Sequence, residues 1–288
     1  MQNDLARLNE RDVRRRFDRA ASSFDQADFL HRLTFDGLLE RLEPVAVTPA
    51  TILDLGSATG AGSRTLAKMY RKARIISADI SLQMLIRGKQ AKSWLSKISA
   101  VQADASHIPL QTGSVDMVFA NMLLPWLDDA DAGFAEIARV LAKGGVCAFS
   151  TLGPDSLLEL RAAWAALDRD AHVNAFADMH DVGDGLVRAG LRDPVLDVDK
   201  IAVSYANCGA LFDDLTRCGA RNCLASRRRS LTGKRRFTRM QERLAETFAG
   251  QQLTFELEII YGHAWGGGPP QRGAEFHLDP ASIGRRQR

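Results

Sequence analysis

The chain has few of the features that mark secreted, metal-bound or membrane proteins. Only 4 of its 288 residues are cysteines, and they form no CxxC pair and have no histidine at zinc-site spacing, which argues against disulfides and structural metal. No run approaches the roughly 18 apolar residues that a membrane span needs, and the first residues lack an apolar signal core. We therefore expect a cytoplasmic protein that holds no metal and binds no membrane.

Acidic residues are missing from one basic segment. Nine basic residues and no acidic one lie between Arg217 and Arg239, so the rest of the chain is net −6 (3 − 9) although the whole chain is net +3. Such a segment suits an acidic partner, although a solvated surface without a partner is the plainer alternative. Nucleic acid is not expected, because only Phe237 interleaves as an aromatic. The basic patch comprises Arg227, Arg228, Arg229, Lys234, Arg235, Arg236 and Arg239.

Strand-like and helix-like segments alternate along most of the chain. Stretches of helical composition separate the first five strand-like segments, and this alternation predicts an α/β fold, a doubly wound and mostly parallel sheet with helices on both faces. Ligands of such sheets bind at the carboxyl ends of the strands. The segments with strand composition are residues 51–56, 74–80, 98–103, 115–121, 146–152, 195–205 and 253–265.

Three regions are expected. Residues 1–44 show two apolar stripes at helical spacing, and these helices either cover the sheet or form a lid over a ligand. Residues 45–265 form the sheet domain, in which a helical insertion at about 206–250 carries the basic patch. Residues 266–288 form a polar tail that we expect to be disordered.

The stretch at residues 51–60 reads as a buried strand that runs into a glycine-containing turn. Gly56 and Gly60 permit positive φ and let a ligand approach the backbone. Asp79 ends the next strand, 19 residues after Gly60, which suits a carboxylate that binds ribose hydroxyls. The glycines do not have the GxGxxG spacing of dinucleotide binding. Asp54, two residues before Gly56, instead suits a ligand with a free ammonium group and no phosphate.

These residues resemble the class I S-adenosylmethionine-dependent methyltransferases. Five segments match the family's motifs in order: residues 52–60, 78–81, 102–110, 115–121 and 140–145. The resemblance implies a Rossmann-like sheet of seven strands with the seventh antiparallel. It also implies S-adenosylmethionine as cofactor, S-adenosylhomocysteine as product, and cofactor-binding residues Asp54, Gly56, Gly60, Asp79, Ile80, Met84, Asp104, Ala105 and Asn121.

Several of these residues have a structural alternative. Asp54 could simply cap the turn, Asp104 could cap a loop end, and Ile80 and Met84 could be ordinary core at the start of a helix. Ala58 stands where the family usually has glycine, and its Cβ would point toward the methionine part of the cofactor. This departure leaves open a weakened cofactor affinity or an inactive binding protein with the methyltransferase fold.

A narrower resemblance covers most of the chain. Residues 16–25, 149–157, 172–174, 178–184 and 261–265 are similar to the malonyl-acyl carrier protein O-methyltransferases of biotin synthesis. The resemblance implies methyl transfer to the free carboxylate of a malonyl thioester on acyl carrier protein, which the basic patch would bind. A related mitochondrial branch, an arginine hydroxylase that assists respiratory complex assembly, is similar in the same places and is the alternative.

Candidate substrate contacts follow from position. Asn121 and Trp126 lie where a substrate would meet the methyl group, although Trp126 could be a buried core aromatic, and Arg221 is a candidate partner for the malonyl carboxylate. Because a carboxylate acceptor is ionised at pH 7, no catalytic general base is expected. A nucleic-acid methyltransferase is disfavoured, because Asn121 is followed by Met-Leu-Leu rather than Pro-Pro-Tyr.

Overall fold

The structure is a computed structural model that describes residues 7–91, 97–230 and 232–268. The predicted polar tail therefore lies outside the described residues from 269 on. The strands are β1 (Thr51–Leu55), β2 (Arg74–Asp79), β3 (Ile98–Gln102), β4 (Val115–Asn121), β5 (Leu141–Leu152), β6 (Leu191–Tyr205) and β7 (Leu253–Gly266). The α-helices are α1 (Glu10–Ala20), α2 (Phe29–Leu42), α3 (Ala61–Met69), α4 (Leu82–Ala91), α5 (Ala130–Val140), α6 (Leu158–Ala165), α7 (Met179–Arg188), α8 (Cys208–Arg217) and α9 (Lys234–Thr247), and two short 3-10 helices are η2 (Phe24–Gln26) and η3 (Leu124–Trp126).

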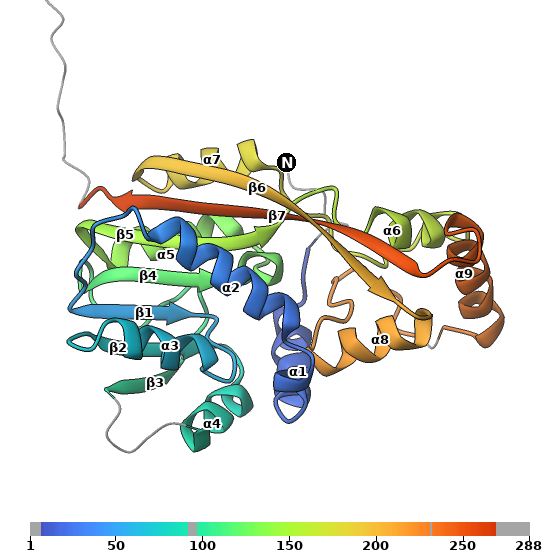
Figure 1. Ribbon diagram of the computed structural model, residues 1–288, viewed down its shortest axis with the longest axis horizontal. Coiled ribbons are helices and arrows are strands. Elements are labelled where there is room, and N and C mark those ends of the chain that lie inside the picture. The colour runs from blue at the N-terminus through green and yellow to red at the C-terminus, as the bar shows by residue number, and fades with distance from the viewer. Residues whose placement is uncertain (1–6, 92–96, 231, 269–288) are drawn as a thin grey trace, which may run out of the picture.

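All seven strands form one sheet in the order β3-β2-β1-β4-β5-β7-β6 (Figure 1). Strands β1 to β5 pair in parallel, whereas β7 runs antiparallel to both of its neighbours. This confirms the predicted α/β class and the antiparallel seventh strand. The strand order reverses at β1 and β4, the place where open sheets of this kind bind ligands.

The central strands are buried on both faces of the sheet. Side chains alternate between faces, so Leu53 and Val118 join one apolar cluster while Ile52 and Phe119 join the other. This double burial is why β1 and β4 read as continuous apolar runs in the sequence.

Two strands are longer than predicted. β5 begins at Leu141 rather than at residue 146, because Val115 of β4 already pairs with Leu141. The register of the pairing then shifts before Met117, so Gly144 and Gly145 lie within the strand. β6 begins at Leu191 rather than at residue 195. Pro194 looks like a strand break in the sequence, but β6 is the edge strand, where a missing N–H costs no ladder hydrogen bond.

The β6–β7 hairpin extends beyond the parallel strands and carries a helical lobe (Figure 1). β5 pairs with residues 259–265 of β7, so the first part of β7 pairs with β6 alone. Helices α6, α8 and α9 pack around this free part in a cluster of their own that includes Trp164, Leu211 and Phe255. The predicted insertion is not helical throughout, because the chain leaves α8 through Gly219 at φ +81° and its described residues form no further helix before α9.

The two N-terminal helices pack at different places on the sheet domain, and the lid over a ligand stays a prediction. α2 covers the sheet, since Phe35 packs 5.0 Å from Phe119 and Gly37 leaves room for the Tyr261 ring. α1 and η2 lie over the carboxyl edge, where Ser81 donates to Asp18 at 2.7 Å and Thr59 donates to Asp25 at 2.5 Å.

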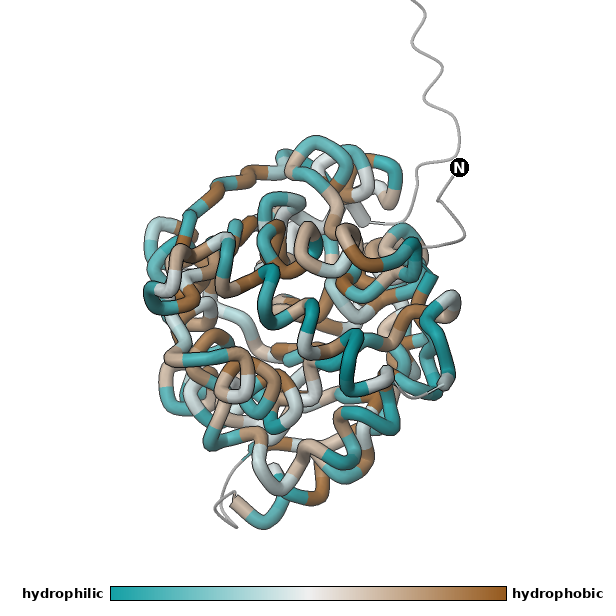
Figure 2. The backbone as a smooth tube through the Cα atoms, turned by 90° about the vertical axis from the view of Figure 1, so that its right-hand side faces the viewer, coloured by the Kyte–Doolittle hydropathy of each residue, from teal (hydrophilic) through white to brown (hydrophobic). Residues whose placement is uncertain are grey.

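Within the described residues, no helix is long and apolar enough to cross a membrane, and hydrophobic stretches in Figure 2 are short and interrupted.

Candidate active site

A cavity lies where the carboxyl ends of the first four strands meet. Because parallel strands end at one edge of the sheet, the loops after them converge there. The cavity lining brings together Gly56 after β1, Asp79 and Ile80 after β2, Asp104 and Ala105 after β3, and Asn121 and Trp126 after β4. Each of these residues was singled out from the sequence as a site candidate.

Asp79 is a carboxylate that backbone hydrogen bonds fix at this cavity. Its Oδ2 accepts from the Ala58 N–H and its Oδ1 from the Ser81 N–H, both at 2.8 Å. Burial raises the pKa of Asp79 to about 6, against the lowering effect of these two hydrogen bonds. Each carboxylate oxygen keeps acceptor capacity for a second hydrogen bond, which suits a pair of ligand hydroxyls.

Left-handed backbone marks the cavity walls. Gly56 has φ +76°, but Ala58 at +46° and Met122 at +56° adopt this conformation with a side chain, which costs energy. Leu157, at +58°, lines a second cavity described below. Strained residues of this kind gather at ligand sites in many proteins.

Three predicted cofactor residues do not line the cavity. Asp54 lies buried beneath the turn, where it accepts from Ser63 Oγ and where burial raises its pKa to about 6. Gly60, at φ +73°, is the N-cap of α3. Met84 is fully buried in an apolar cluster with Phe24. Contact between any of these three and a cofactor stays a prediction.

The N-terminal helices supply cavity residues that the sequence did not single out as site residues. Val13 and Phe17 of α1 and Phe24 of η2 also line the cavity. Their apolar stripe was visible in the sequence, but it did not distinguish a lid from a cover.

A larger cavity lies between the sheet domain and the helical lobe. Its volume of about 370 Å³ falls in the range of cavities that hold small organic ligands. Apolar side chains of the hairpin and lobe, such as Phe212 and Phe255, form much of its wall, and Arg221 also lines it. Among the described residues, three side chains line both cavities: His31, Met122 and Trp126. A group transferred from one cavity to the other would pass these three.

His31 is held neutral at this junction. Its Nδ1 is buried and has no hydrogen-bond partner among the described residues, and burial lowers the pKa of His31 to about 4. Asn121 fixes the backbone here, because its side-chain amide donates to the His31 carbonyl at 2.8 Å while its oxygen accepts from Ser150 at 2.7 Å. His31 was not predicted, since nothing local in the sequence distinguishes it.

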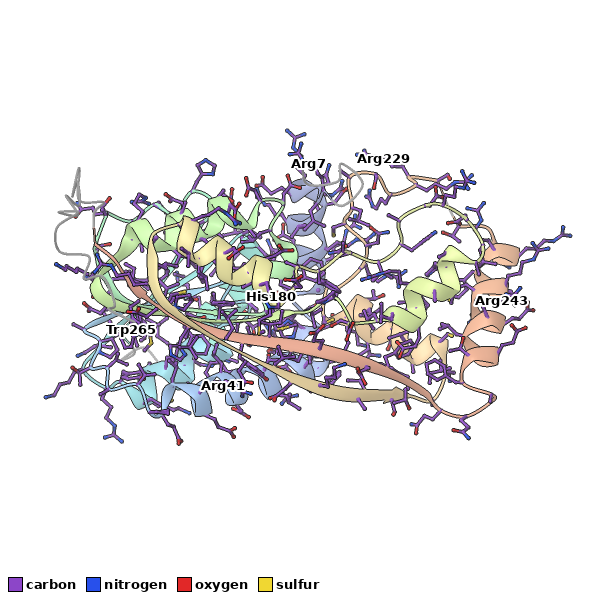
Figure 3. The ribbon with its side chains drawn as sticks, turned by 90° about the horizontal axis from the view of Figure 1, so that it is seen from above. Arg7, Arg41, His180, Arg229, Arg243 and Trp265 are labelled. Atoms are coloured by element: carbon purple, nitrogen blue, oxygen red, sulfur yellow. The ribbon has the colours of Figure 1, made fainter. Side chains whose placement is uncertain are left out.

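The basic patch lies partly at the rim of the larger cavity. Arg227, Arg228 and Arg236 line that cavity. Arg227 pairs with Asp12 at 2.7 Å and Arg236 with Asp168 at 3.1 Å, so their charges are compensated within the chain. Figure 3 shows Arg229 projecting from the loop near the N-terminal segment. Five members of the patch are exposed: Arg228, Arg229, Lys234, Arg235 and Arg239.

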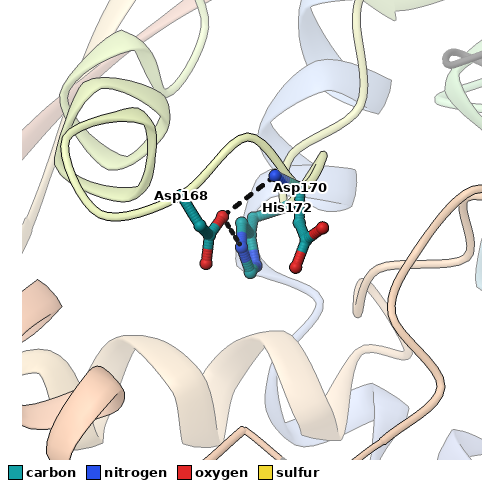
Figure 4. A group of neighbouring side chains, drawn as sticks. All are labelled: Asp168, Asp170 and His172. Carbon is teal, nitrogen blue, oxygen red and sulfur yellow. Dashed lines mark hydrogen bonds and ion pairs between the residues drawn. The ribbon is translucent and has the colours of Figure 1, made fainter.

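One acidic cluster has the composition of a cation site. The ligand atoms of Asp168, Asp170 and His172 lie within 4.8 Å of one another (Figure 4). The Arg236 guanidinium already supplies a cation there, at 3.1 Å from Asp168 and 3.7 Å from Asp170. The His172 ring stacks on Trp164 at 3.8 Å. The cluster therefore ties α9 to the loop after α6.

Comparisons with known proteins agree with this geometry. Residues 53–149 match the family described as a methyltransferase domain. A malonyl-[acyl-carrier protein] O-methyltransferase of Halorhodospira halophila is 40% identical over 291 residues, which cover 99% of each chain. The Bacillus subtilis YcgJ protein superposes with a TM-score of 0.60 at 14% identity, over 83% of this chain and 100% of that one. Haemonchus contortus phosphoethanolamine N-methyltransferase 2 in complex with S-adenosyl-L-methionine superposes with a TM-score of 0.52 at 13% identity. The superposition covers 86% of this chain and 57% of that one. The predicted methyltransferase resemblance is confirmed.

Proposed function

The chain belongs to the malonyl-[acyl-carrier protein] O-methyltransferase family, and we propose that it methylates the free carboxylate of a malonyl thioester on acyl carrier protein with S-adenosylmethionine as cofactor. By the family resemblance this reaction serves biotin synthesis. The observation that carries the proposal is the junction at His31, Met122 and Trp126, where the cavity at the strand ends meets the larger cavity. The names of the relatives favour this reaction over the arginine hydroxylase alternative.

The polar and apolar residues that line the smaller cavity suit the parts of the proposed cofactor, and its volume of about 100 Å³ must increase to hold the whole molecule. Asp79 would accept hydrogen bonds from the ribose hydroxyls, and Asp104 would accept from the adenine amino group. Ile80 and Phe17 line the same cavity and would provide apolar walls for the base. When bound, the cofactor supplies an electrophilic methyl group on a sulfonium.

The chemistry needs positioning more than acid or base catalysis. A malonyl carboxylate is ionised at pH 7, so its oxygen can form the new bond to the methyl carbon directly. Because the bound cofactor would supply the methyl group together with its own leaving group, no residue of the chain would need to give or take a proton. His31 is neutral and would take no proton at pH 7. Together with Met122 and Trp126 it would align the reacting atoms and exclude water.

The position of the patch supports a carrier-protein partner. Arg228 is exposed and also lines the larger cavity, so a thioester arm entering there would bring its protein against the exposed arginines. An acidic carrier would be steered to this rim by charge. We also propose a cytoplasmic location, because all four cysteines are free, which suits a reducing compartment.

A methyl-transfer assay tests the proposal. The protein is incubated with methyl-labelled S-adenosylmethionine and malonyl-, acetyl- or succinyl-carrier protein. We expect base-labile label on the malonyl carrier and none on the acetyl carrier, which has no free carboxylate. Cofactor binding without label on the malonyl carrier would overturn the proposed function and favour a binding protein or the hydroxylase branch.

A further inference from the structure

The larger cavity carries an excess of positive charge. Five arginines line it: Arg16, Arg221, Arg227, Arg228 and Arg236. Among the described residues, Asp214 is the one acidic group of its lining, and it accepts from the Tyr205 hydroxyl at 2.8 Å. Arg227 and Arg236 have carboxylate partners outside the cavity, and Arg228 is exposed at the rim. Among the described residues, Arg16 and Arg221 are therefore the two arginines of this lining that are neither exposed nor paired with a carboxylate.

Arg221 is held in a fixed position without a counter-ion. Its Nη1 donates to the Phe212 carbonyl at 3.3 Å and to Thr216 Oγ1 at 3.1 Å, and its guanidinium lies 5.0 Å from the Phe212 ring. Burial and the nearby charge of Arg16 both lower the pKa of Arg221. In the described part of the chain, no carboxylate forms a salt bridge with Arg221 or with Arg16. Two like charges held together in this way favour binding of an anion.

The two arginines come from distant segments that meet beside the junction of the cavities. The loop after α8 packs on α1, since the Asn9 N–H donates to the Cys223 carbonyl at 2.8 Å. A Cβ on Gly219 would lie 2.9 Å from the Phe17 ring, so this glycine permits the close approach. Phe17 follows Arg16 directly, and its ring lies 5.1 Å from that of Trp126, which lines both cavities.

We propose that Arg16 and Arg221 form an anion subsite that holds the substrate carboxylate beside the cofactor cavity and releases it once methylation has removed its charge. The subsite rests on the proposed function for the identity of its ligand. Arginine guanidinium groups suit carboxylates because several N–H donors can bind the two oxygens together. The ester product keeps the shape of the substrate but loses the ionic attraction, so the same two residues provide both substrate selection and product release.

Binding measurements test the subsite without relying on turnover. Calorimetry compares malonyl-N-acetylcysteamine with its methyl ester, in the presence of S-adenosylhomocysteine. We expect the wild type to prefer the malonyl compound by about 100-fold, the scale of charged hydrogen bonds. Arg16→Met, Arg221→Met and the double variant should lose this preference, and Arg221→Lys should keep part of it. Arg188→Gln is the matched control, because this exposed arginine pairs with Asp131 far from the cavity lining.

The outcomes separate the possible failures. Unchanged preference in both methionine variants would overturn the subsite. The subsite would also be overturned if the methionine variants bound malonyl-carrier protein more weakly but bound the phosphate-free thioester normally. The arginines would then bind the phosphate of the carrier's arm. S-adenosylhomocysteine binding by each variant shows whether the lid and fold are intact. If the wild type binds the malonyl compound selectively but transfers no methyl group, the subsite stands and the proposed function fails.

Discussion

Replacing Ala58 by glycine tests whether the turn after β1 is strained. At φ +46°, an L-residue costs about 1–2 kcal/mol relative to glycine. Two effects oppose this gain: glycine stabilises the unfolded chain by about 0.4–1 kcal/mol, and loss of a half-buried methyl costs about 0.4 kcal/mol. We therefore expect Ala58→Gly to change the free energy of unfolding by about +0.4 kcal/mol, within a range of about −0.4 to 1.2.

The same substitution should act more strongly on the cofactor. Ala58 lines the cavity, and its backbone N–H donates a hydrogen bond to Asp79. Removing a crowding methyl group at such a contact is worth about 1 kcal/mol, so S-adenosylhomocysteine should bind about fivefold more tightly. Ala58→Val adds bulk at the same strained φ, and we expect it to weaken binding at least tenfold and to destabilise the fold.

Urea unfolding and calorimetry with S-adenosylhomocysteine measure the two effects separately. Ala249 provides the control, because it has φ +48°, is exposed and does not line either cavity. Ala249→Gly should therefore relieve similar strain and leave affinity unchanged. The reasoning is refuted if Ala58→Gly weakens cofactor binding, or if it destabilises the protein by more than about 1 kcal/mol while Ala249→Gly does not.

Three further predictions concern buried charge, the lid and the patch. Asp54→Asn removes a buried carboxyl whose pKa of about 6 lies above its ordinary 3.8, a difference worth up to about 3 kcal/mol. Above pH 6 the buried carboxylate is charged and lowers the free energy of unfolding, and this cost disappears as the carboxyl gains its proton. The variant should therefore unfold at a higher urea concentration than the wild type at pH 7.5 and at a similar concentration near pH 4. An equal gain in stability at both pH values would contradict this prediction. Asp18→Ala with Asp25→Asn removes the two lid contacts and should weaken S-adenosylhomocysteine binding by about tenfold in calorimetry, whereas the exposed Asp36→Asn on α2 should have no effect. Arg229→Glu with Arg235→Glu should lower kcat/KM for the malonyl carrier about tenfold at low salt and less at high salt, with no change for the N-acetylcysteamine thioester. Arg243→Glu, at the far end of the lobe in Figure 3, is its control, and a loss independent of salt would argue against steering by charge.

The strand ends could be predicted because local pattern determines them. A short apolar run followed by glycine or aspartate places Gly56, Asp79 and Asp104 at one sheet edge in any parallel sheet. Arg16 and His31 could not be predicted, since their surroundings depend on how α1 meets the loop after α8 and how α2 begins. Tertiary packing of this kind leaves no periodic signal in one sequence.

The basic patch also shows what charge counting in a sequence cannot predict. Counting charges treated its seven members as alike, yet Arg227 and Arg236 have carboxylate partners within the chain. Phe237, noted as the aromatic between the basic residues, packs 5.3 Å from Phe212 inside the lobe. Composition therefore located the surface but could not tell which side chains stay available to a partner.

The projecting hairpin makes the two halves of the protein mechanically continuous. Ser150 on β5 pairs with Tyr261 on β7, and Tyr261 pairs in turn with Asp197 on β6, so an unbroken ladder links the lobe to the strand beside Asn121. A force on the lobe would therefore be transmitted to β5 through the backbone hydrogen bonds of the hairpin. Because the lobe has an apolar cluster of its own, its residues can differ without changing the strands whose ends line the smaller cavity.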